Sequence, residues 1–143
     1  MAITSAICNS FKTEILTGTH NFTASSGNTF TLALYTSSAS LGASTTAYTT
    51  SNEVSGTGYT AKGNALTSVT PTLDSSTAVC DFADTSFTSA SFTARGCLIF
   101  NDSATGDPAV CAIDFGSDKT VTSGTFTIQF PTADASNAII RIA

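Results

Sequence analysis

Apolar residues recur every fourth position near the N-terminus, which is the spacing of one face of an α-helix. The pattern predicts a helix over about residues 4–17, capped by Thr4 or Ser5 and ended by a left-handed Gly18. Three turns are too short to be stable alone in water, so the apolar stripe must pack on something. We expect Ile7, Phe11 and Ile15 to be the packing residues. The full stripe is Ile3, Ile7, Phe11 and Ile15, flanked by Cys8 and Leu16.

The rest of the chain alternates apolar and polar residues with the period of a β-strand. Eight or so short strands without a second helix predict one domain over 1–143, an all-β antiparallel sandwich of jelly-roll or immunoglobulin-like type. Periodicity does not choose between those two topologies. The predicted strands are NTFTLALYT, ALTSVTPTL, TAVCDFA, ASFTA, RGCLIFN, AVCAIDFG, KTVT, TFTIQFP and AIIRI. Turn signals separate several of them, at 101–108, 116–118, 123–124 and 131–137.

A polar, glycine-containing stretch over about 37–64 is too long for an ordinary connection between strands. Long loops in compact domains are usually functional or are ordered by a partner. We therefore predict that this loop makes partner contacts. The residues expected to make them are Tyr48, Thr49, Asn52, Glu53 and Tyr59.

Composition suggests what kind of surface these strands present. Charged residues make up only 10% of the chain, against roughly 25% in an ordinary soluble domain. Ser and Thr together supply about a third of it. Hydroxyls are much cheaper to desolvate than unpaired ions, so such a surface suits extensive, fixed protein contact. A plain bias of an exposed β protein toward Ser and Thr explains the same composition, and both interpretations stay open.

Charge and hydropathy exclude several classes of function. A net charge of −5 with five scattered basic residues leaves no electrostatic footprint for nucleic acid. No charged segment followed by an apolar one marks a secretory signal, and no apolar run reaches the roughly 18 to 20 residues of a membrane span. We expect a soluble protein that is made in a cytoplasm and binds neither nucleic acid nor membrane.

Candidate chemistry is sparse. The one histidine, His20, has no flanking nucleophile motif and is expected to be structural. Acid pairs at 81–84 and 102–107 match no calcium-loop pattern and are interpreted as turn residues. The four cysteines lack zinc spacing, and one hairpin register places Cys97 opposite Cys111, where a disulfide would be conceivable. We expect no enzyme activity, cofactor or metal.

Several segments resemble a family of small virion proteins encoded by tailed bacteriophages. The resemblance covers nearly the whole chain and contains no catalytic signature. It implies a capsid cement (decoration) protein on the outer surface of an HK97-type shell, with the major capsid protein as partner and a homotrimer as its form. The host's bacterial cytoplasm would then be the place of assembly. The segments are CNSFKTEILTGTHNF (8–22), FTLALYTSSASL (30–41), TAYTTSNEVSGTGYTAKGNAL (46–66), SFTARGCLIFN (91–101) and a tail containing DFG, DKTVTSGTFTIQFP and ADASNAIIRIA.

Other functions remain as alternatives. A tail-tip or fibre-associated adhesion protein would share the same composition and fold. A carbohydrate-binding module also fits a sandwich, although the chain has no Trp on which a sugar could stack. A hydrolase that uses Asp81 and Asp84 is the weakest of these readings.

Overall fold

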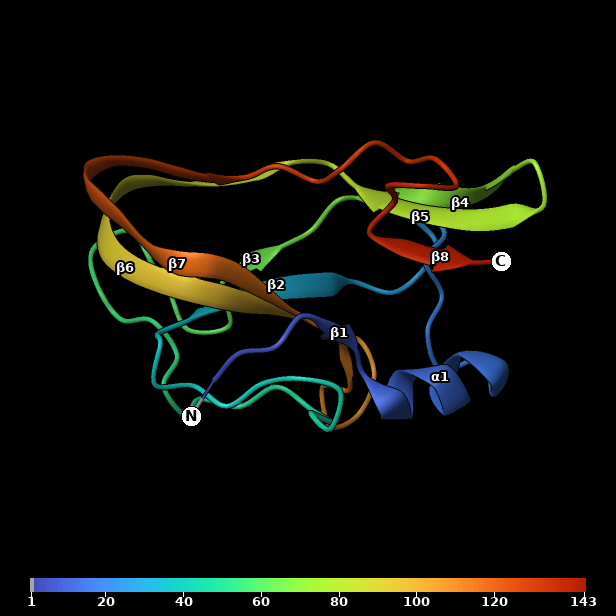
Figure 1. The fold of residues 1–143 in the computed structure, drawn as a ribbon, viewed down its shortest axis with the longest axis horizontal. Helices are drawn as coiled ribbons and strands as arrows, with labels where there is room; N and C mark the ends of the chain where they lie inside the picture. Colours follow the sequence, from blue (N-terminus) through green and yellow to red (C-terminus); the bar gives the residue numbers. More distant parts are fainter. Residues whose placement is uncertain (1) are drawn as a thin grey trace.

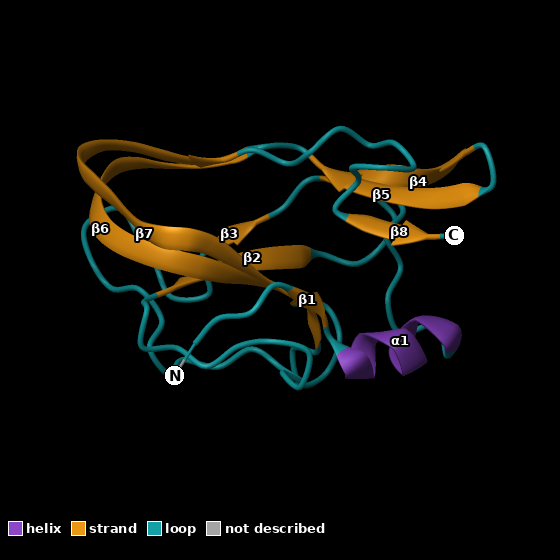
Figure 2. Ribbon diagram, viewed as in Figure 1, coloured by secondary structure: helices purple, strands orange, loops and turns teal. Residues whose placement is uncertain are grey.

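Strands are the main regular structure of the chain, with loops and one short helix between them (Figures 1 and 2). The computed structural model describes residues 2–143. Its elements are β1 (Ala6–Ile7), α1 (Asn9–Leu16), β2 (Phe30–Tyr35), β3 (Asn64–Ala65), β4 (Ser68–Asp74), β5 (Thr77–Phe82), β6 (Thr85–Asn101), β7 (Ala109–Ile128) and β8 (Ile140–Ile142).

The strands form two antiparallel sheets packed against each other. The larger sheet has the order β1-β7-β6-β2-β3, and the smaller has the order β4-β5-β8. The arrangement is sandwich-like but not closed, and one short helix lies near the N-terminus. The predicted fold class is therefore confirmed. Pro71 lies within an irregularity of β4 between Val69 and Thr72, because a proline cannot donate a backbone hydrogen bond to the strand ladder.

Strands β6 and β7 pair with each other as one long ribbon that belongs to the large sheet. Figure 1 shows this ribbon starting beside the small sheet, bending at the far end of the molecule and returning as the middle of the large sheet. Register shifts at Ala90/Phe92 and Ala94/Gly96 lie along this course. Bulges bend a strand and increase its twist, which lets one hairpin turn the corner between two sheets.

The turns predicted at 116–118 and 123–124 are wrong, because β7 continues through both. The register passes from Ala94 opposite Lys119 to Gly96 opposite Asp114, so that four residues of β7 bulge out opposite Arg95. The left-handed backbone of Gly116, with a φ of 81°, falls in this bulge. Glycine and serine there mark bends inside a strand rather than its ends.

The core lies between the sheets and is rich in phenylalanine. Strand β2 alternates apolar and polar residues only in part, and all six of its residues are buried. The reason is that β6 and β3 flank β2 within the sheet and the loop after it covers its second face. The rings of Phe22 and Phe30 stack at 4.2 Å, and Phe82 of the small sheet contacts both.

The N-terminal helix is shorter than predicted. It begins at Asn9 with an extended Cys8 before it and no side-chain cap, so neither Thr4 nor Ser5 caps it. The expectation that Ile7 packs from a helix is wrong, because Ile7 lies in β1 opposite Cys111 of β7. Side chains alternate between the two faces of a β-strand, so residues four positions apart, such as Ile3 and Ile7, also lie on the same face of a strand. Edge pairing with β7 then decides between the two structures.

The remaining helix predictions hold in part. Phe11 is buried, and Ile15 is partly buried and packs against the core. Gly18 ends the helix with a φ of 78°, as predicted. Leu16, expected beside the packing stripe, is instead 88% exposed. No helical segment of residues 2–143 has the length and apolar character needed to span a membrane.

The long loop between β2 and β3 is held by its own domain. Ala39, Leu41 and Val54 are buried in the core. The amide of Val54 donates to the carbonyl of Leu34 at 2.9 Å, and the amide of Tyr48 donates to the carbonyl of Asp107 at 3.0 Å. The loop is ordered by these contacts and does not require a partner for its conformation.

We predict that Phe11→Ala destabilises the protein by about 3–5 kcal/mol, because it leaves a cavity where an aromatic ring packs on His20 and Phe22. Urea unfolding followed by circular dichroism measures this. The control is Leu16→Ala on the same helix, expected to change stability by no more than about 0.5 kcal/mol because Leu16 is exposed. Equal losses in the two variants would contradict the packing described here.

Candidate docking surface

One end of the sandwich presents large apolar side chains to solvent. Leu16 is 88% exposed, Leu73 is 72% exposed and Ile142 is 54% exposed. Leu73, Ala78 and Ile142 lie in one row across β4, β5 and β8. Figure 1 places α1 at the same end of the molecule as these strands. We call Leu16, Leu73, Ala78 and Ile142 the apolar end face.

A narrow groove of about 70 Å³ crosses this end between α1 and the small sheet. No charged residue lines it. The charged residues next to Leu73 and Ile142 in the sequence make other contacts: Asp74 accepts from the amide of Ala135 at 2.7 Å, and Arg141 donates to the carbonyl of Ala135 at 3.1 Å. The groove residues are Ile15, Phe22, Pro71, Ala78, Val79, Cys80, Ile140 and Ile142. Exposed apolar side chains around an uncharged groove are typical of a contact surface.

The sequence offered only a weak signal for this surface. Leu16 was expected beside the packing stripe of the helix, and the strand pattern around Leu73 did not mark that residue as exposed. They are exposed because α1 and the β4–β5 hairpin extend past the region where the layers meet. How far an element reaches beyond its neighbours is a tertiary property that local periodicity does not encode.

Three of the predicted contact residues meet inside the long loop. The carboxylate of Glu53 accepts hydrogen bonds from the hydroxyl of Tyr48 at 2.6 Å, the hydroxyl of Tyr59 at 2.7 Å and the amide of Lys62 at 2.7 Å. The hydroxyl of Tyr59 in turn accepts from the amide of Leu34 in β2 at 2.9 Å. Glu53 therefore fastens the loop to the large sheet.

Burial and the carboxylate together disfavour the ionised form of both tyrosines. Burial and the hydrogen bond to Glu53 raise the pKa of Tyr48 to about 12. The same two causes raise the pKa of Tyr59 further. Both phenols remain protonated donors at any physiological pH, which is the state that the Glu53 contact requires.

The other two predicted contact residues lie at the turn that precedes Glu53. The carbonyl of Thr49 accepts a hydrogen bond from the buried Tyr35 hydroxyl at 2.7 Å. Asn52 is exposed and left-handed, with a φ of 60°, and its carbonyl accepts from the amide of Thr36 at 3.0 Å. Of the five, Asn52 is the one whose side chain is most available to a partner.

We predict that Glu53→Ala lowers the free energy of unfolding by about 2–4 kcal/mol, because two hydroxyls and an amide lose their acceptor. Urea denaturation monitored by tyrosine fluorescence measures it. Asp118→Ala is the matched control, since Asp118 is an exposed acid in a β7 bulge. An effect of Glu53→Ala no larger than that of the control would rule out a fastening role.

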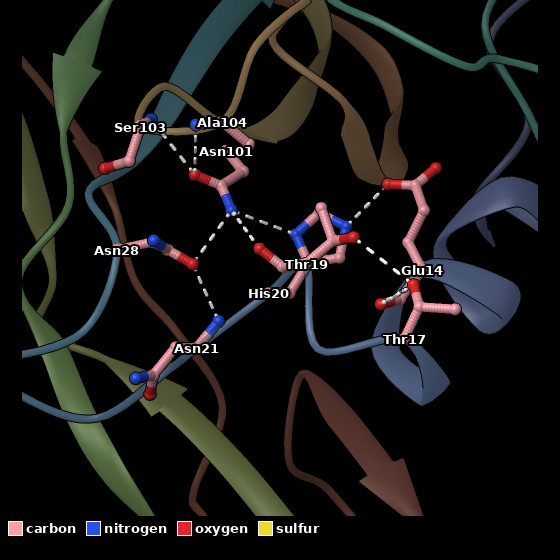
Figure 3. A network of polar contacts seen from close by, with 9 residues as sticks. All are labelled: Glu14, Thr17, Thr19, His20, Asn21, Asn28, Asn101, Ser103 and Ala104. Carbon is pink, nitrogen blue, oxygen red and sulfur yellow. Dashed lines mark hydrogen bonds and ion pairs between the residues drawn. The ribbon is translucent and has the colours of Figure 1, made fainter.

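His20 belongs to a buried polar network that joins α1 to the β6–β7 hairpin (Figure 3). Its Nε2 lies 2.7 Å from a carboxylate oxygen of Glu14, and its Nδ1 lies 3.2 Å from the side-chain nitrogen of Asn101. The Asn101 oxygen accepts from the amides of Ser103 and Ala104, which fixes the orientation of its side chain. Nδ1 therefore accepts and Nε2 donates to Glu14. Both ring nitrogens are occupied, as a structural histidine requires.

Three of the four acids in the two pairs are engaged in local structure, whereas the Oδ1 of Asp81 is buried without a hydrogen-bond partner among the described residues. Asp102 and Asp107 flank the Lys62 ammonium at 2.7 and 2.9 Å, and these contacts raise the pKa of Lys62. Asp84 accepts from the amide of Phe130 at 2.8 Å. Within residues 2–143 no group of three or more His, Cys, Asp or Glu side chains is arranged to hold a metal ion.

All four cysteines are buried free thiols. The register that would place Cys97 opposite Cys111 is wrong, since Cys97 lies opposite Ile113 and Cys111 lies opposite Ile99. Burial raises the pKa of Cys97 to about 12 and that of Cys80 to about 12, and it raises the pKa of Cys111 well above its usual range. The thiolate is the reactive form, so these thiols are inert in the folded protein.

We predict that the native protein does not react with Ellman's reagent at pH 8, where every thiol pKa lies far above the solution pH. In denaturant the burial is removed, and all four thiols should react quickly. Absorbance at the reagent's product band counts them in each state. One thiol that reacts at once in the native protein would contradict the burial described here.

A comparison of the chain with protein-family models, with curated proteins and with solved structures found no match in any of the three.

Proposed function

We propose that the chain is a virion structural protein of a tailed bacteriophage, most simply a cement protein on the outer surface of an HK97-type capsid. The apolar end face is the single observation that carries the proposal. Leu16, Leu73 and Ile142 expose side chains that are normally buried, although the domain has a buried core of its own. Such a surface gains free energy when a partner removes it from water.

The magnitudes favour many copies acting together. Fully burying a large aliphatic side chain contributes roughly 1.5–3 kcal/mol, so three of them contribute roughly 5–9 kcal/mol. Association costs about 4–15 kcal/mol in lost translational and rotational freedom. One copy would bind weakly by this surface alone. An oligomer, such as the homotrimer that the resemblance implies, would convert weak single contacts into firm attachment through effective concentration.

The rest of the molecule suits a mechanical role. The long loop is fastened by Glu53, and the β6–β7 ribbon is paired along the middle of the large sheet, so little conformational entropy remains to be lost on docking. The negative net charge suits the outside of a shell better than a position against packaged DNA. In this proposal the protein bridges neighbouring capsomers of the major capsid protein through buried area and hydrogen bonds.

Copy number in purified particles tests the location. A cement protein should be present in hundreds of copies per particle, measured by quantitative gel densitometry against the major capsid protein. A few copies per particle would favour the alternative of a tail-tip or fibre-associated protein. Absence from mature particles, or turnover of a substrate by the isolated protein, would overturn the proposal.

We predict that Leu73→Asp abolishes binding to heads that lack the protein, because it places a charge in the apolar end face. Co-sedimentation with such heads measures binding. The variant should fold normally, since Leu73 is 72% exposed. Thr88→Asp on exposed β6 is the matched control and should bind like the wild type. Full binding by Leu73→Asp would remove the end face from the mechanism.

A further inference from the structure

A second and larger apolar opening lies between the two layers, on the edge formed by β7. It has a volume of about 520 Å³ and is distinct from the apolar end face. Ile113 and Phe115, in the first half of β7, line one side of the opening. Phe126 and Ile128, at the C-terminal end of β7, line the other. Buried Cys97 also lines it. We call this opening the β7-edge groove, and its remaining lining residues are Lys119, Thr127, Gln129, Phe130, Pro131 and Ile139.

The groove is open because the sandwich is not closed on this side. β1 pairs with β7 only at Cys111 and Ala112, so the outer edge of β7 after these residues has no neighbouring strand among the described residues. The apolar side chains at this edge are partly exposed, although they point between the layers. A sandwich that simply completed its core would cover them.

The charge pattern of the groove is selective. The chain carries ten acids and five Lys or Arg residues, yet the lining contains one lysine and no acid. Lys62 and Arg95 are each held in ion pairs, whereas Lys119 forms no ion pair with any carboxylate of residues 2–143. An apolar cavity with one cation at an exposed position of its lining is complementary to an apolar molecule that carries one negative charge.

We propose that the β7-edge groove binds a medium-chain fatty carboxylate, with the alkyl chain against the rings of Phe115 and Phe126 and the carboxylate on the ammonium of Lys119. The size agrees: a cavity of about 150 Å³ accommodates a six-carbon ring, so 520 Å³ has ample room for about twelve carbons and a headgroup. Lys119 is the group in the lining that would fix the orientation of the ligand. The aromatic rings and aliphatic side chains of the lining would supply the contact area.

A second copy of the chain, adding a strand to this edge, is the competing occupant. An added strand needs a regular row of backbone donors and acceptors. The edge is interrupted where four residues bulge opposite Arg95 and again beside Ser123, whose φ is 45°. The opening also reaches inward to a buried thiol, which gives it the depth of a cavity rather than of a flat pairing surface. Both observations favour the small ligand.

Isothermal titration with dodecanoate below its micelle concentration tests the proposal. We expect saturable binding at one site per chain. Lys119→Gln should weaken dodecanoate binding about tenfold and leave the binding of dodecanol unchanged, because only the carboxylate uses the charge. Lys12→Gln, which removes an exposed lysine of α1, is the matched control and should bind both probes like the wild type. Lys119 is exposed, so its variant should fold.

Filling the groove gives a second readout. Ile139→Trp should weaken binding of both dodecanoate and dodecanol, with folding checked by circular dichroism. Leu73→Asp, at the apolar end face, should bind both probes normally, so failure of the capsid proposal would leave this one standing. The proposal is overturned if dodecanoate does not bind saturably, if Lys119→Gln binds it like the wild type, or if sedimentation shows a dimer that Ile139→Trp dissociates.

Discussion

The folded-over β6–β7 ribbon is the constraint on which the rest of the structure depends. Its backbone pairing runs from Thr85 opposite Ile128 to Phe100 opposite Ala109, so one folded-over hairpin extends from a position beside the small sheet to the middle of the large sheet. Bulges permit the corner, and phenylalanines on the inner face of the two limbs then meet: Phe92 and Phe126 lie 5.2 Å apart, and Phe115 and Phe126 lie 6.3 Å apart. Without this corner neither the core nor the β7-edge groove would exist.

Buried polar groups complete what the ribbon begins. Glu53 holds the long loop against β2, and Asn101 ties the β6–β7 turn to His20 and hence to α1. Each network satisfies groups that would be costly to bury alone. The result is a block whose loops are fixed by its own contacts. Rigidity of this kind suits a protein whose proposed work is adhesion, because docking then orders few additional residues.

The apolar surface divides into two places with different physics. The end face projects from the molecule and has almost no enclosed volume, which suits contact with another protein surface. The β7-edge groove is enclosed on two sides and has one unpaired cation in its lining, which suits a small amphiphile. The two proposals therefore rest on different residues and fail independently.

The sequence by itself determined the features that depend on near neighbours. Alternation gave the β class, Gly18 gave the end of the helix, and the turn residues at 101–108 gave the β6–β7 hairpin loop. Tertiary structure decided whatever depends on distant partners. Ile7 lies in a strand because it pairs with the edge of β7, and Gly116 lies in a bulge because β6 continues along β7 on both sides of it. Leu16 and Leu73 became surface because nothing packs beyond them. Local periodicity records which side chains share a face, but only the assembled chain decides what covers that face.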